Sequence, residues 1–139
     1  MAQLARAAAN DSTFAKFSRS LGSLTAVEGF VRDNYVYRDE TEEIVRDPRF
    51  MLADMGRIDD SGRVVQLEGD CDDVSTLFAA FALALGKSAR FVAIRYTPTA
   101  SGFEHVFAEA YDGGQWRILD ATVPPGTNLN WIESMIEEV

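Results

Sequence analysis

One segment near the middle of the chain constrains the fold more than any other. In residues 71 to 85 the apolar side chains recur at helical spacing, at Val74, Leu77, Phe78, Phe81 and Leu85. This spacing predicts a helix with one strongly apolar face. Gly86 follows directly and is suited to end the helix in a left-handed conformation. Such a face must be buried, so the rest of the chain has to supply a surface that covers it.

Three segments after this helix have the patterns of β-strands. Residues 90 to 97 are rich in apolar and β-branched side chains. Residues 103 to 111 alternate in polarity, which predicts one face made of Phe103, His105, Phe107 and Glu109. Residues 115 to 121 follow a turn predicted at 112 to 114, Asp-Gly-Gly. These strands predict an antiparallel meander on which the helix packs.

The N-terminal half is predicted to consist of helices and loops. Residues 2 to 20 have a weak helical pattern. Residues 25 to 35 have a stronger one, because Thr25 and Glu28 match a capping box. Asp47 followed by Pro48 fits the N-cap and first position of a short helix.

Two further segments complete the predicted order of elements. Residues 56 to 69 are expected to form a loop with a turn at 60 to 62, and residues 128 to 139 a short C-terminal helix. Helices followed by a central helix and an antiparallel meander indicate an α+β fold. The length of 139 residues fits a single domain over 1–139 that folds without a disulfide or a metal.

Charge and composition argue against several classes of protein. A net charge of −9 disfavours binding to nucleic-acid phosphates and docking on anionic membranes. No run approaches the roughly 20 apolar residues of a membrane span, and residues 1 to 10 lack the features of a signal peptide. The single cysteine, Cys71, excludes an internal disulfide and fits a reducing compartment, so we expect a cytoplasmic protein.

Cys71 stands at the start of the predicted central helix, directly after Gly69 and Asp70. The positive end of the helix dipole favours a thiolate there, and the Cys71 amide is placed to donate to an oxyanion. The carboxylates of Asp70, Asp72 and Asp73 act in the opposite direction, because negative charge beside the sulfur disfavours the thiolate. A base is therefore needed nearby.

The chain contains one histidine, His105, which lies in the second predicted strand. Asp120 lies near the end of the next strand. Pairing across a turn centred near Gly113 sets position 105 opposite position 120 or so, where a carboxylate can orient the imidazole. We therefore predict a catalytic triad of Cys71, His105 and Asp120.

Other interpretations of these residues compete with the catalytic one. A lone cysteine is usually a small buried residue, and a lone strand histidine is usually a hydrogen-bonded core residue. The three residues could also bind zinc, although no second Cys or His strengthens that site.

Two neighbouring features are also open to more than one reading. The acidic residues at 70 to 73 lack the turn glycine and closing glutamate of a calcium loop, so they fit helix capping better. Gln66, five residues before Cys71, is either the second oxyanion donor through its side-chain amide or a solvated loop residue.

Residues 66 to 122 resemble the transglutaminase-like superfamily of papain-fold cysteine enzymes. The resemblance rests on three motifs in order: GDCDDVS at 69 to 75, HVFAE at 105 to 109 and WRILDAT at 116 to 122. The segments at 30 to 37 and 45 to 51 are similar to small bacterial and phage-encoded members. Nothing resembles the calcium-binding loops or extra β-domains of animal transglutaminases.

The resemblance implies a papain-like core, with the central helix on an antiparallel sheet, and a cysteine enzyme without cofactor or metal. Its substrate would be a peptide, a protein or a small amide, attacked to form a thioester. Hydrolysis is favoured over cross-linking, because water is always available and no second-substrate site is visible. The alternative is a non-enzymatic structural or assembly protein, phage-encoded, that retains the fold.

Overall fold

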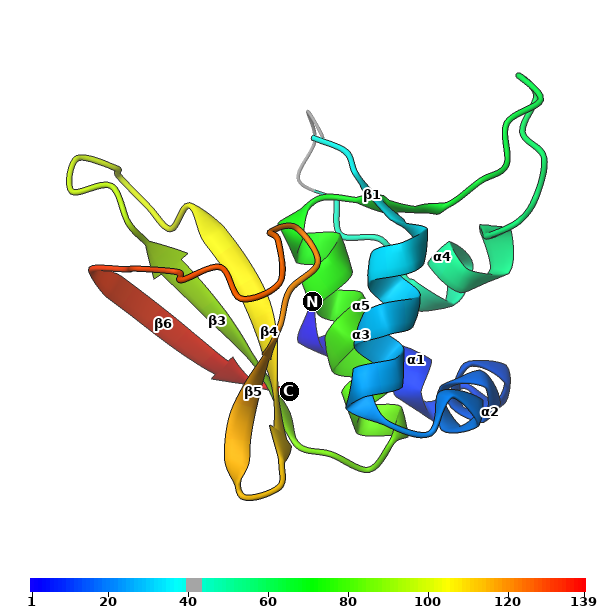
Figure 1. Cartoon of the computed structure of the whole chain (residues 1–139), viewed down its shortest axis with the longest axis horizontal. Helices are drawn as coiled ribbons and strands as arrows, with labels where there is room; N and C mark the ends of the chain where they lie inside the picture. The colour runs from blue at the N-terminus through cyan, green and yellow to red at the C-terminus, as the bar shows by residue number, and fades with distance from the viewer. Residues whose placement is uncertain (40–43) are drawn as a thin grey trace.

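The computed structural model describes residues 1–39 and 44–139. These residues form five helices and six strands (Figure 1). The helices are α1 (Ala2–Asn10), α2 (Ser12–Leu21), α3 (Leu24–Asn34), α4 (Pro48–Asp54) and α5 (Cys71–Ala84). The strands are β1 (Tyr35–Tyr37), β2 (Leu67–Gly69), β3 (Ala89–Arg95), β4 (His105–Asp112), β5 (Gln115–Leu119) and β6 (Glu133–Glu138). The predicted α+β class is confirmed.

The last four strands form one antiparallel sheet in the order β5-β4-β3-β6. β1 and β2 form a separate parallel pair in which Tyr37 lies opposite Gly69. Figure 1 shows α5 between the sheet and the other helices; it contacts β3 and β4 on one side and α1, α2 and α3 on the other. The sheet and the helical layer therefore share α5 as a common core.

α5 is buried around most of its circumference, whereas its spacing of large apolar residues predicts a single buried face. Leu77, Phe78 and Phe81 are fully buried, and so are the alanines at 79, 80 and 82. The ring of Phe81 lies 4.9 Å from Phe14 of α2. Burial of side chains of this size stabilises the fold by roughly 1.5–3 kcal/mol each. The alanines lie outside the spacing of large apolar side chains, and they bury the remaining sides of the helix.

The start of the chain forms two helices where one weak helix is predicted. The break lies at Asp11, whose carboxylate accepts hydrogen bonds from the backbone N–H groups of Thr13 (3.0 Å) and Phe14 (2.9 Å). An aspartate in this position satisfies the free amides at the start of α2. The chain therefore ends α1 and begins α2 without an intervening loop.

The predicted capping box at Thr25 and Glu28 is wrong. α3 begins two residues earlier in the sequence, with Ser23 as its N-cap accepting from the Ala26 N–H at 3.2 Å. Glu28 instead pairs with Arg32 at 3.1 Å and with Arg117 of β5 at 2.6 Å. Glu28 therefore takes part in a long-range ion pair, whereas the local motif predicts that it caps the helix. By contrast, Asp47 is confirmed as the N-cap of α4, with Pro48 as its first residue.

The predicted C-terminal helix is also wrong, because residues 133 to 138 form β6. This strand pairs antiparallel with β3, with Arg90 opposite Glu138 and Ala93 opposite Met135. The edge of β3 that does not face β4 supplies hydrogen-bond partners that a local pattern cannot reveal. Strand formation here is decided by the neighbouring strand more than by local preference.

The segment predicted as a loop between α4 and the cysteine helix contains some strand pairing. Ile58 and Val64 form an isolated antiparallel bridge around a turn in which Gly62 has a φ of 81°. Figure 1 shows this arm projecting from the helical side. β2 then follows and leads directly into α5. Across the described residues, the helices are too short or too polar to cross a membrane.

Candidate active site

Cys71 is the first residue of α5, and a capping box holds it there. The Asp70 carboxylate accepts hydrogen bonds from the N–H groups of Asp72 (3.0 Å) and Asp73 (3.4 Å). The Asp73 carboxylate accepts in return from the Asp70 N–H at 3.3 Å. Two of the three aspartates beside the cysteine are thus used in helix capping, and they fix the direction in which α5 starts.

The backbone before Cys71 is held from two further sides. Asp73 is buried and accepts a 2.6 Å hydrogen bond from the Arg46 N–H. Its side chain lies against Gly69, where an added Cβ would come within 2.2 Å of the Asp73 Oδ2. The Tyr35 hydroxyl donates to the Gly69 carbonyl at 2.8 Å. Gly69 is therefore required by its close approach to Asp73.

His105 and Asp120 are in direct contact. The His105 Nε2 lies 2.7 Å from the Asp120 Oδ2, and both side chains are largely buried. The second oxygen of Asp120 accepts from the Thr122 N–H at 2.8 Å and from its hydroxyl at 2.7 Å. The carboxylate therefore cannot turn away from the imidazole without losing two hydrogen bonds.

Arg32 of α3 holds the segment that carries Asp120. Its guanidinium donates to the backbone carbonyls of Asp120 and Val123, the latter at 2.8 Å. Arg32 is itself paired with Glu28 one turn earlier in α3. The sequence reasoning missed both Arg32 and Thr122. Thr122 could have been noticed, because a Thr two residues after an Asp is a common turn partner for its carboxylate.

Asp120 reaches His105 by a different register from the predicted one. The β4–β5 ladder pairs Asp112 with Gln115 and ends with Ala108 opposite Leu119. Continued in register, position 120 would lie opposite 107. Asp120 therefore meets His105 diagonally, after the chain has left the ladder. The turn contains only Gly113 and Gly114, both with positive φ, and this two-residue turn sets the register.

The surroundings of His105 favour its charged form. Burial alone would lower the pKa of His105, but the hydrogen bonds to Asp120 and to Cys71 outweigh burial and raise this pKa to about 9. Burial likewise acts to raise the pKa of Asp120, yet the hydrogen bonds from His105 and Thr122 bring it below its usual value. Because Nε2 faces Asp120, Nδ1 is the ring nitrogen left for the Cys71 sulfur.

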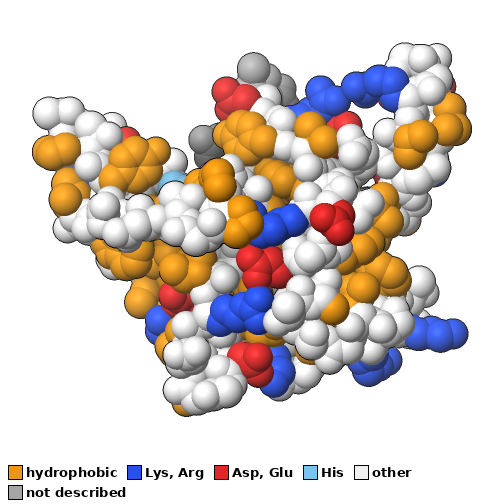
Figure 2. Space-filling view, in the orientation of Figure 1, with side chains coloured by type: hydrophobic (Ala, Val, Ile, Leu, Met, Phe, Trp, Pro, Cys, Tyr) orange, Lys and Arg blue, Asp and Glu red, His pale blue; other side chains and the backbone are white. Residues whose placement is uncertain are grey.

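Cys71 and His105 line the same cavity, with a volume of about 530 Å³. It lies between the N-terminus of α5 and the sheet, and its other walls include Phe91 and Ala93 of β3 and Met135 and Glu137 of β6. The surface of the molecule is visibly hollowed between the sheet and the helices (Figure 2). This volume is within the range of small-ligand sites in proteins.

Gln66 is not brought to this cavity. It is exposed and lines a separate cavity of about 360 Å³ together with Arg46, Phe50 and Glu68.

Two tyrosines of β1 have raised pKa values, and Cys71 is among the causes. The pKa of Tyr35 is raised above its usual range, first by burial and then by electrostatic interaction with Tyr37, Asp70 and Cys71. The pKa of Tyr37 is also raised, first by burial and then by electrostatic interaction with Asp39 and Cys71.

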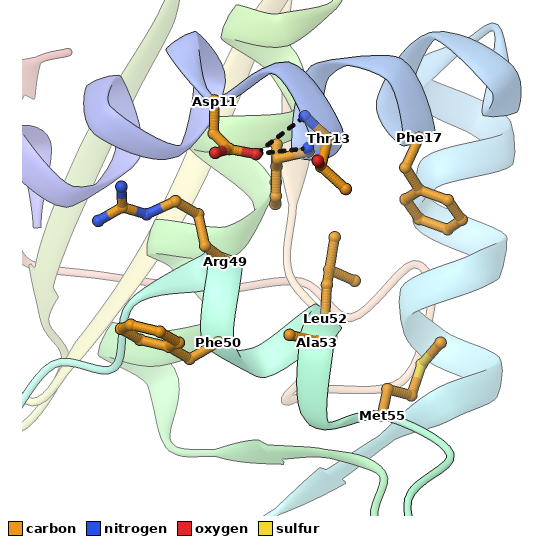
Figure 3. Close-up of a pocket in the computed structure, with 9 residues that line it drawn as sticks. Asp11, Thr13, Phe17, Arg49, Phe50, Leu52, Ala53 and Met55 are labelled. Atoms are coloured by element: carbon orange, nitrogen blue, oxygen red, sulfur yellow. Dashed lines mark hydrogen bonds between the residues drawn. The ribbon is translucent and has the colours of Figure 1, made fainter.

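A second cavity of about 550 Å³ lies between α2 and α4 (Figure 3). Its walls are largely apolar and include Phe17, Leu52 and Met55, with Asp11 and Arg49 near its edge. The only cysteine and the only histidine of the chain line the other cavity, so this one has neither a thiol nor an imidazole. The chemistry is therefore expected at Cys71.

Within residues 1–39 and 44–139, no group of three or more His, Cys, Asp or Glu side chains is arranged to hold a metal ion. The carboxylates beside Cys71 have the capping and backbone contacts described above.

Comparison with known proteins places this geometry in a family. The family model of the transglutaminase-like superfamily matches residues 7–121. No curated protein matches the chain in sequence. The fold resembles the crystal structure of a "putative cysteine protease" from Cytophaga hutchinsonii, with a TM-score of 0.58 and 21% sequence identity. The match covers 79% of this chain but only 37% of that one. The protein belongs to the transglutaminase-like superfamily, as its three motifs predict.

Proposed function

We propose that the protein is a cysteine-dependent acyl-transfer enzyme that acts on amide or peptide bonds through Cys71, His105 and Asp120. The observation that carries this proposal is the 2.7 Å contact between His105 and Asp120, because His105 also lines the cavity that Cys71 lines. A buried carboxylate on one ring nitrogen leaves the other for the thiol, which is the arrangement that an activated nucleophile requires.

In the proposed reaction, His105 already holds the proton given up by Cys71, as its raised pKa favours, and the thiolate attacks the substrate carbonyl. The Cys71 N–H, at the N-terminus of α5, donates to the oxyanion. His105 then protonates the leaving amine, and the C–N bond breaks to give a thioester. Water, deprotonated by His105, releases the acyl group and restores the thiol. Asp120 remains ionised and holds the imidazole in one orientation.

Hydrolysis is favoured over transfer to an amine. Phe103 and Met135, which line the cavity, are 42% and 53% exposed, so water has access to a thioester formed there. Transfer requires that water be kept away from the intermediate. The walls of this cavity do not exclude water.

The test is to trap the thioester. Purified protein is incubated with panels of peptide, isopeptide and small amide substrates, and the mass of each is followed with and without hydroxylamine. We expect an acyl adduct on Cys71, a carboxylic acid as product, and a hydroxamate when hydroxylamine is present. Cys71→Ala is the control and should give none of these.

Two outcomes would change the proposal. Preferential capture by added primary amines at low concentration would indicate a transferase. Failure of a broad panel to acylate a well-folded protein would instead favour the binding or assembly role.

A further inference from the structure

One wall of the Cys71 cavity is built from a strand that alternates apolar and acidic side chains. Met135 and Glu137 are two residues apart on β6, so both point to the face that lines the cavity. Opposite them in β3 lie Ala93 and Phe91, which line the cavity too. This wall offers an apolar surface that ends at a carboxylate.

The wall lies within reach of the reacting atoms. Ala93 pairs with Met135 on one side and with Val106 on the other, and Val106 is adjacent to His105. Two strand spacings separate β4 from β6, which is about 10 Å. A long side chain on a residue next to the attacked carbonyl can cover that distance.

The cavity walls carry four acidic side chains, and the imidazole of His105 is the one basic side chain among the described residues that line it. Asp70, Asp72, Glu104 and Glu137 line it, and no lysine or arginine is among the described residues that do so. Focusing of such a field in a cleft attracts cations and repels anions. The net charge of −9 acts in the same direction at longer range.

Three of these carboxylates are held by contacts of their own. Asp70 caps α5, and Asp72 lies beside the Cys71 sulfur, with its Oδ1 3.9 Å from Sγ. Glu104 accepts from the Thr97 hydroxyl at 2.6 Å and from the N–H groups of Thr97 and Tyr96. The Thr97 hydrogen bonds lower the pKa of Glu104, so it remains charged at neutral pH. Glu137 is exposed and makes no ion pair within the described residues, which leaves it available to a ligand.

We propose that this cavity selects acyl substrates with a lysine or arginine side chain on the residue whose carbonyl Cys71 attacks. The inference rests on the proposed function and specifies its substrate class. The methylene stem of the substrate side chain lies along Met135 and Ala93, and its cationic end pairs with Glu137. Glu104, Asp70 and Asp72 supply the surrounding negative potential.

The experiment uses three peptidyl chloromethyl ketones that differ only in the residue next to the reactive group: lysine, norleucine or glutamate. Norleucine has the apolar stem of lysine without the ammonium, so the lysine-to-norleucine ratio isolates the effect of charge. Attack by the thiolate forms an S–C bond and releases chloride. The second-order rate constant for loss of the Cys71 thiol is measured for each probe, by intact mass.

We expect the lysine probe to react on the order of tenfold faster than the norleucine probe, and the glutamate probe to be slowest. Raising the salt concentration should reduce the ratio, since the cavity opens to solvent. Glu137→Gln should reduce the lysine-to-norleucine ratio by about two- to fivefold while leaving the norleucine rate nearly unchanged. Glu138→Gln is the matched control, because Glu138 points to the other face of β6.

The inference is overturned if norleucine reacts as fast as lysine, or if E138Q and E137Q reduce the ratio equally. In both cases fast alkylation of Cys71 would leave the proposed function standing. If all three probes react no faster with Cys71 than with a free model thiol, the proposed function fails and the selectivity with it.

Discussion

Asp120 uses its two carboxylate oxygens differently, one toward His105 and one toward Thr122. Asp120→Asn keeps the size of the side chain but removes its charge, and an amide NH₂ directed at Nε2 favours the imidazole tautomer that carries its proton on Nδ1. That tautomer cannot accept the Cys71 proton. We expect kcat/KM to fall by a factor on the order of 10–10³. The circular dichroism spectrum should be unchanged, because the fold is retained.

Asp112→Asn is a suitable control for this substitution. Asp112 ends β4 and pairs with Lys87 at 2.6 Å, on a partly exposed surface. The same change of chemistry there should leave kcat/KM unchanged. Equal losses in the two variants would contradict the orienting role of Asp120.

The titration of His105 can be followed directly, because the chain has only one histidine. We expect its imidazole proton resonances in NMR spectra to titrate with a midpoint near 9, compared with 6.5 for a free histidine. The pKa is raised in the folded state, so the linked stabilisation is complete below about pH 6.5 and is lost as the pH rises through about 9. A midpoint at or below 6.5 would show that burial outweighs the contacts with Asp120 and Cys71.

At the scale of secondary-structure elements, the close approach of Gly69 to Asp73 can be tested by adding one methyl group. Gly69→Ala places a Cβ 2.2–2.7 Å from three atoms of the Asp73 side chain. This buried side chain must move and weaken its hydrogen bonds to Asp70 and Arg46. We expect a loss of about 1–3 kcal/mol in the free energy of unfolding, measured by urea denaturation.

Gly29→Ala is the matched control, at a glycine with open space around it. Gly29 lies inside α3, and an added Cβ there meets no atom within 4 Å. The substitution should stabilise the protein by about 0.5–1 kcal/mol, because alanine has the higher helix propensity. A destabilised G29A together with an unaffected G69A would contradict the description of both sites.

The elements predicted correctly from sequence are those specified by nearby residues. The cysteine helix and the Asp47-Pro48 helix start each have their determinants within a few positions. β6 does not, since its partner β3 lies about forty residues earlier in the chain. The predicted capping box of α3 is wrong for a similar reason, because Glu28 forms an ion pair with the distant Arg117.

The same distinction applies to the site. The motifs predict Cys71, His105 and Asp120 as a group, and in the structure Asp120 and Cys71 both interact with the His105 imidazole. Gln66 was inferred from its separation along the chain alone, and it lies directly before β2, where it lines another cavity. Arg32 acts on Asp120 across 88 residues of sequence, so no local pattern reveals it.

At the scale of the whole molecule, α5 forms the core for both the sheet and the helical layer. We therefore expect unfolding to be a single cooperative transition. Trp116 and Trp131 lie in and beside the sheet, so their fluorescence reports on that half, while circular dichroism at 222 nm reports mainly on the helices. The two urea curves should coincide. Separate midpoints would show that the halves unfold independently.

The division of the site between the two halves also has a consequence during synthesis. The thiol stands at the start of α5, whereas the imidazole and carboxylate belong to β4 and the segment after β5. The ribosome adds Cys71 thirty-four residues before His105 and forty-nine before Asp120. Until those residues emerge and dock, a nascent chain carries an ordinary thiol beside three acidic residues. We therefore expect Cys71 to gain its reactivity only after the segment through Asp120 has been made and has brought its carboxylate to His105.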